Sequence, residues 1–114
     1  MSKRAYTLFL QDILASILKI DEFIEGLNFN EFSTDEKTRE AVVRKLEIIG
    51  EAARNLPNEF RDKYPQIPWE KMISMRNKML HEYFGVDEEI LWQTITEDLP
   101  LLKKQLQNLP EISA

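Results

Sequence analysis

Apolar residues recur at helical spacing along most of the chain. In the first thirty residues they follow one another in steps of three and four, which places them on one side of a helix. The residues of this stripe are Tyr6, Leu10, Ile13, Ile17, Ile20, Ile24 and Leu27. Leu14 and Leu18 widen the stripe, so we expect the first helix to contact more than one neighbour. Gly26 lies near its end.

A second helix is predicted over residues 37–56, where one face is apolar and Pro57 ends the pattern. The segment before it, residues 28–36, is predicted to be a loop. Within it, Ser33 followed by Glu36 has the spacing of a capping box at the start of the second helix.

Gly50 lies inside the second helix, where glycine costs about 1 kcal/mol relative to alanine. It could be a tolerated defect. The interpretation that we favour is a close approach of another helix at Gly50, Ala52 and Ala53.

The next segment is rich in proline and has room for one short helical turn between Asn58 and Tyr64. A third helix is predicted from about Trp69 to Phe84. Gly85 is suited to the position just after its last turn, because glycine readily adopts the left-handed conformation found there.

A fourth helix is predicted to begin after Asp87, which acts as its N-cap. Pro100 lies within its apolar pattern, so it either kinks this helix or opens a short last one. We favour a break near Asp98. No strand pattern or repeat is present, so we predict an all-α antiparallel bundle of four main helices plus short helical pieces, forming a single domain over residues 1–114.

Composition narrows the possible functions. The chain has 114 residues, no cysteine and one histidine, which excludes disulfides, thiolate zinc sites and a multi-histidine metal site within one chain. The absence of cysteine fits a reducing cytoplasm, where we expect the protein to be located. A net charge of −5 argues against duplex binding through a broad basic face. The basic, apolar start of the chain could suggest a signal peptide, but Gln11 and Asp12 interrupt it.

The third helix places a cation on its apolar side. A helical wheel puts Arg76 near the middle of a broad face. The apolar residues of that face are Trp69, Met72, Ile73, Met79, Leu80 and Tyr83. Because a guanidinium cannot lose its charge, Arg76 needs a carboxylate, backbone carbonyls, a bound anion or a second subunit as its partner. Glu47 and Glu51 are weak candidates, since they lie away from the apolar stripe of their own helix.

The only histidine lies on a different side of the same helix. Asn77 and His81 are four residues apart and share one flank. An ideal helix places Arg76 and His81 roughly 140° apart. The two can act on one substrate only if the arginine reaches around the helix, the helix ends near His81, or a second chain contributes.

These residue types suit one kind of chemistry. Arg76, Asn77, His81 and Tyr83 supply a fixed cation, an amide, a titratable base and a phenol within eight residues. Cleavage of RNA without a metal needs a base for the ribose 2′-OH, an acid for the leaving oxygen and a cation for the phosphorane-like charge. The alternative is structural: a surface histidine near a helix end, an arginine in an ion pair and a core tyrosine.

The segment RNKMLHEY has the pattern of an arginine, four residues, a histidine, any residue and a tyrosine. It resembles the signature of HEPN domains (higher eukaryotes and prokaryotes nucleotide-binding). The segments IIGEAARNLP, IPWEKMISMRNKMLHEYFGVD and ILWQTITEDLPLL resemble the HepT branch of that family, so the resemblance covers nearly the whole chain.

The resemblance implies a homodimer that is the toxin of a type VII toxin–antitoxin pair. It implies a ribonuclease that needs neither metal nor cofactor and acts on tRNA or mRNA. Arg76 and His81 correspond to the catalytic residues and Asn77 to a supporting one. The implied antitoxin is an MntA-like minimal nucleotidyltransferase, which silences the toxin by transferring AMP from ATP onto Tyr83. Lys71 and Lys78 could contact RNA.

Three hypotheses therefore remain. The chain is a ribonuclease toxin; or it is a non-catalytic module that binds a nucleotide or the nucleotidyltransferase through Arg76 and His81; or it is a structural bundle in which these residues affect only stability.

Overall fold

The computed structural model describes residues 3–82 and 85–113, and all regular structure in these ranges is helical. The main helical segments are α1 (Lys3–Ile24), α3 (Glu36–Asn55), α5 (Trp69–His81) and a last segment made of α6 (Glu88–Gln93), the π-helical turn η2 (Thr94–Asp98) and α7 (Leu99–Gln107). The short helices are α2 (Phe29–Thr34), α4 (Asn58–Lys63) and α8 (Pro110–Ser113). The prediction of an all-α fold with four main helices and short pieces is confirmed.

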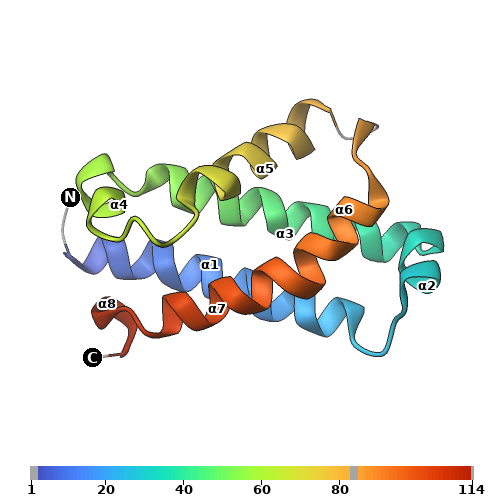
Figure 1. Ribbon diagram of the computed structural model, residues 1–114, viewed down its shortest axis with the longest axis horizontal. Helices are drawn as coiled ribbons and strands as arrows, with labels where there is room; N and C mark the ends of the chain where they lie inside the picture. The colour runs from blue at the N-terminus through green and yellow to red at the C-terminus, as the bar shows by residue number, and fades with distance from the viewer. Residues whose placement is uncertain (1–2, 83–84, 114) are drawn as a thin grey trace.

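Helix α3 lies at the centre of the arrangement. It has extensive contacts with α1 and with α5, while α7 packs on α1. In Figure 1, α1 and α3 follow the long axis of the molecule and α5 lies over α3. The last segment passes diagonally in front of α1 and α3. None of the helices in the described residues is both long enough and apolar enough to cross a membrane.

The middle of the predicted stripe of α1 forms part of the core. Leu10, Ile13, Ile17 and Ile20 are fully buried, and burying a side chain of this size contributes about 1.5–3 kcal/mol. As predicted, α1 contacts several neighbours, namely α3, α7 and α8. Leu18, however, is 50% exposed and extends the stripe into solvent.

The predicted loop over residues 28–36 is wrong, because it contains α2. The Asn28 side chain accepts a hydrogen bond from the Glu31 backbone N–H (2.8 Å), and the Asn28 backbone N–H donates to the Glu31 side chain (3.0 Å). This is a capping box one helix earlier than expected. Phe32 is fully buried and secures the short helix to the core.

The N-cap of α3 is Asp35, so the predicted capping box of Ser33 and Glu36 is also wrong. Asp35 accepts hydrogen bonds from the backbone N–H and the hydroxyl of Thr38, at 3.1 and 2.6 Å. These bonds lower the pKa of the Asp35 carboxyl, because they favour its ionised form. Ser33 lies inside α2, where its hydroxyl donates to the Asn30 carbonyl.

Arg39 of α3 connects α2 to the start of α6. Its guanidinium donates to the Ser33 carbonyl and forms an ion pair with Glu88 at 3.5 Å. Asp87 caps α6 as predicted, accepting from the backbone N–H groups of Glu89 and Ile90 at 2.8 and 3.3 Å.

The predicted break near Asp98 is wrong, since Asp98 keeps a helical conformation (φ −75°, ψ −43°). The chain passes Pro100 through a wider turn instead: the Leu99 N–H bonds to the Thr94 carbonyl, five residues earlier. A proline ring clashes with the carbonyl four residues before it and offers it no donor. The π-helical turn η2 accommodates both effects without leaving helical backbone.

The third helix is shorter than predicted. It ends at His81 rather than near Phe84, with Glu82 as its C-cap in a non-helical conformation (φ −134°, ψ 31°). The Gly85 N–H closes a turn onto the Glu82 carbonyl (2.9 Å), so Gly85 does not have the predicted capping role. The helical turn predicted between Asn58 and Tyr64 is confirmed as α4.

Candidate functional site

The position of Arg76 is determined by a close contact between α3 and α5. A Cβ atom added to Gly50 would lie 2.2 Å from the Arg76 Cβ and 2.6 Å from the Met72 carbonyl oxygen. Both distances are far below van der Waals contact, so only glycine allows the two helices to approach this closely. The predicted close approach is confirmed at Gly50.

The Arg76 side chain starts on the α3 side of α5 and reaches the exposed flank. Its Nη1 donates a hydrogen bond to the Asn77 Oδ1 at 3.0 Å, and Asn77 is exposed. Across residues 3–82 and 85–113, no carboxylate forms an ion pair with Arg76, so neither Glu47 nor Glu51 is its partner. Arg76 is half-buried rather than fully buried, which is why an amide suffices as its partner.

His81 is the last residue of α5, and its side chain is exposed. It follows Asn77 by four residues on the same flank. The guanidinium of Arg76 therefore reaches toward the flank that carries the imidazole, and the helix ends there. One of the three conditions under which Arg76 and His81 could act together, the end of the helix near His81, is present in one chain, and the bond to Asn77 turns the guanidinium toward that side. No hydrogen bond joins these two side chains in the described residues.

Tyr83, the predicted site of modification, lies outside the described residues. Leu80, which the helical wheel predicts on the buried face of the helix, is 44% exposed. It lies about 100° from Met79, which is buried against the core, and so at the edge of the apolar stripe.

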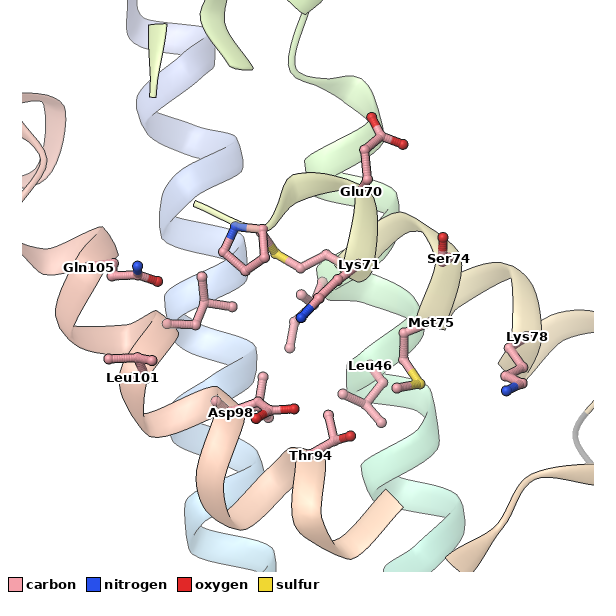
Figure 2. Close-up of a pocket in the computed structure, with 15 residues that line it drawn as sticks. Leu46, Glu70, Lys71, Ser74, Met75, Lys78, Thr94, Asp98, Leu101 and Gln105 are labelled. Carbon is pink, nitrogen blue, oxygen red and sulfur yellow. The ribbon is translucent and has the colours of Figure 1, made fainter. Parts of the chain in front are cut away.

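Lys71 and Lys78 border a cleft of about 470 Å³ between α5 on one side and η2 with α7 on the other. Leu46 and Ile49 of α3 contribute to its lining. Figure 2 shows Lys71 and Asp98 projecting into this space from opposite walls.

Sequence reasoning missed this cleft, including Asp98 and Thr94 on its wall. Its lining comes from segments far apart in the chain. The available signal was Pro100 inside a helical pattern, since an irregular turn often marks a functional site. In the part of the chain that the structure describes, no group of three or more His, Cys, Asp or Glu residues could hold a metal ion.

The arrangement at the end of α5 can support acid–base chemistry on a phosphodiester. It places an exposed imidazole one turn beyond an amide that holds a guanidinium. The cation can stabilise negative charge while the imidazole moves a proton.

Comparison with known proteins gives a consistent result. Residues 13–109 match the family model described as Ribonuclease HepT-like. The chain is 48% identical over 107 residues to the candidate ribonuclease HepT of Thermococcus cleftensis, covering 94% of this chain and 97% of that protein. It is 46% identical over 107 residues to the candidate RNase MJ1380 of Methanocaldococcus jannaschii, covering 94% of this chain and 98% of that protein. No solved structure matches the chain at a significant level.

Proposed function

Because the chain belongs to the HepT-like ribonuclease family, we propose that it is a toxin that cleaves RNA through Arg76 and His81 without a metal ion. The observation that supports this most directly is the Arg76–Asn77 hydrogen bond, which carries the guanidinium toward the flank of His81. The exposed His81 at the end of α5 is accessible to a substrate on that same flank.

In this mechanism His81 accepts the proton of the ribose 2′-OH, and the 2′-oxygen forms a bond to phosphorus. The bond from phosphorus to the 5′-oxygen then breaks, and that oxygen takes up a proton. The products are a 2′,3′-cyclic phosphate and a 5′-hydroxyl. Arg76 stabilises the negative charge that develops on the phosphoryl oxygens, and Asn77 orients the guanidinium.

One chain supplies one imidazole, whereas this reaction needs both a base and an acid. A homodimer with the ends of two α5 helices facing each other would supply the second. Two exposed apolar side chains support such pairing: Leu80 near the end of α5 and Ile90 on α6, which are 44% and 54% exposed. Dimer formation would remove both from water.

The cleavage assay is the direct test. Purified, unmodified protein is incubated with tRNA and with mRNA in the presence of a chelator, and we expect products that end in a cyclic phosphate. Intact RNA that is nevertheless bound in an Arg76-dependent way would instead identify a non-catalytic nucleotide-binding module.

The proposed partner is an MntA-like nucleotidyltransferase that modifies Tyr83. The tyrosine oxygen would attack the α-phosphorus of ATP, pyrophosphate would leave, and AMP would remain on the ring. Tyr83 follows His81 at a distance of two residues in the sequence. Negative charge and bulk at that distance would repel an RNA phosphate and obstruct its approach.

Coexpression with this partner should increase the intact mass by one or more adenylyl groups, and Tyr83→Phe should abolish the increase. Tyr6→Phe and Tyr64→Phe are matched controls. The phenols of these two residues donate to Glu59 (3.2 Å) and Glu111 (2.9 Å). Burial, and then the neighbouring carboxylate, raises the pKa of each phenol, and the carboxylate holds each hydroxyl in a hydrogen bond. A mass increase that persists in Tyr83→Phe would exclude regulation at this position.

A further inference from the structure

We propose that the cleft between α5 and the η2–α7 segment binds one base of the RNA strand that is cut at His81. This inference rests on the proposed ribonuclease function and concerns how the substrate is held. It adds Asp98, Met72 and Met75 to the residues that contact RNA, on a wall opposite the two lysines and on the surface between them.

The size and the lining of the cleft suit a flat ring. Its volume of about 470 Å³ lies within the range of roughly 300–1,000 Å³ that is typical of small-ligand pockets. Its inner surface is apolar and includes Leu46, Ile49 and two methionines, Met72 and Met75. Methionine sulfur makes favourable contacts with aromatic rings. Proteins that recognise single-stranded RNA commonly hold splayed bases against such surfaces.

The charges at the cleft differ in sign from those of the whole chain. Of its two acidic residues, Glu70 forms an ion pair with Arg61 at 3.3 Å. Figure 2 shows its carboxylate directed away from the opening. Lys71, Lys78 and Asp98 take part in no ion pair within the described residues. Two lysines and one aspartate therefore give the cleft a net positive charge, although the formal net charge of the whole chain is −5. Phosphate is the expected partner of the two ammonium groups.

The polar groups opposite the lysines favour a base that donates hydrogen bonds. Asp98 is an acceptor, the Thr94 hydroxyl already donates to the Ile90 carbonyl (2.9 Å), and the Gln105 amide already donates to the Gln66 carbonyl (3.2 Å). Adenine, cytosine and guanine each present an amino group, whereas the corresponding edge of uracil presents a carbonyl oxygen. We therefore expect the cleft to prefer an amino-bearing base to uracil.

The cleft continues toward the proposed catalytic residues. Lys78 precedes His81 by three residues, which is about 4.5 Å along the axis of α5 and about 60° around it. A phosphate bound at Lys78 is therefore adjacent to the imidazole. An RNA strand with one base in the cleft can pass its backbone over Lys78 to the end of the helix. A second copy of this chain is a less suitable occupant, because the centres of protein interfaces are depleted of charged residues.

The test uses protein with His81→Ala, so that the RNA stays intact, and with ¹³C-labelled methionine methyl groups. The probes are short single-stranded RNAs of adenine, cytosine or uracil. We expect the Met72 and Met75 methyl signals to shift on addition of the adenine and cytosine probes, and to shift less with uracil. Met79 is buried and does not line the cleft, so its signal is the internal control.

Affinity measured by fluorescence anisotropy provides the second readout. Lys71→Gln should raise the Kd about threefold to fivefold, as expected for the loss of one exposed charge pair. The matched control is Lys104→Gln, which removes the same charge from an exposed position outside the cleft and should leave the Kd unchanged. Asp98→Asn should reduce the preference for amino-bearing bases.

Unmoved Met72 and Met75 signals, or an equal effect of both lysine variants, would overturn the proposal. The proposal would also be overturned if the Met72 and Met75 signals shifted with protein concentration but not with added RNA, because a second copy of the chain would then occupy the cleft. The proposed ribonuclease function fails separately: if unmodified wild-type protein does not cleave RNA while Met72 and Met75 still respond, the cleft binds RNA but the catalytic assignment is wrong.

Discussion

Replacing His81 with alanine should lower the rate of RNA cleavage by about 10²-fold or more while leaving the fold intact. Positioned proton transfer contributes about 10²–10⁴-fold to the rate of such reactions. The side chain is exposed at the end of α5 and makes no hydrogen bond within the described residues, so its removal should not affect packing. Initial rates on a defined RNA, together with circular dichroism and denaturant unfolding, measure both effects.

Arg76 provides the companion variants. Arg76→Ala should reduce cleavage by about 10²–10³-fold through loss of charge stabilisation. Arg76→Lys should recover only part of that loss, because an ammonium lacks the planar, multidentate geometry of a guanidinium. If His81→Ala cleaves RNA and arrests growth as well as wild type, His81 is not the base, and the catalytic assignment must be abandoned.

Of the three glycines, Gly50 should be the most sensitive to replacement by alanine on steric grounds. The new Cβ would overlap the Arg76 Cβ and the Met72 carbonyl oxygen, and both atoms are fixed by the backbone of α5. Overpacking of this kind costs about 1–3 kcal/mol, against a gain of about 1 kcal/mol in helix propensity. The helix must therefore move away from α3 or the protein must lose stability.

In Gly50→Ala, the loss of cleavage rate, expressed as a free energy, should exceed the loss in the free energy of unfolding. Arg76 moves with α5, and a displacement of about 1 Å in a catalytic group can cost about 10²-fold in rate. The matched control is Gly85→Ala, which meets no atom within 4 Å and should change the free energy of unfolding by less than about 0.5 kcal/mol. Denaturant unfolding and cleavage rates give the comparison. A Gly50→Ala protein that equals wild type in both would contradict the close contact of α3 and α5.

Long periodic segments made most of the fold predictable. The stripes of α1 and α3 each extend over several turns, so the period of 3.6 residues identifies them without ambiguity. Helix α2 has six residues, too few to display a period. It depends on the Asn28 cap and on the burial of Phe32, and neither feature is distinguishable in sequence from a polar loop.

The candidate site was predictable in its residue types but not in its geometry. Gly50 was identifiable in the sequence because glycine is unfavourable inside a helix. Its presence there correctly indicated a close contact with another helix. Asn77 could not be recognised from the sequence as the partner of Arg76, because adjacent residues in a helix normally point in different directions. Asn77 becomes reachable only because the arginine side chain is long and the end of α5 is exposed. The cleft depends on packing between α3, α5 and α7, which no local pattern encodes.

The connection between α5 and α6 joins two fixed points. At one end the contact with Gly50 holds α5, and at the other Arg39 binds Glu88 at the start of α6. The six residues 82–87 between them can span at most roughly 20 Å. A group attached within this connection is therefore tethered to the end of α5 by a short stretch of chain. The proposed modification of Tyr83 lies within this connection and is covalent, so we expect that dilution alone would not reverse it.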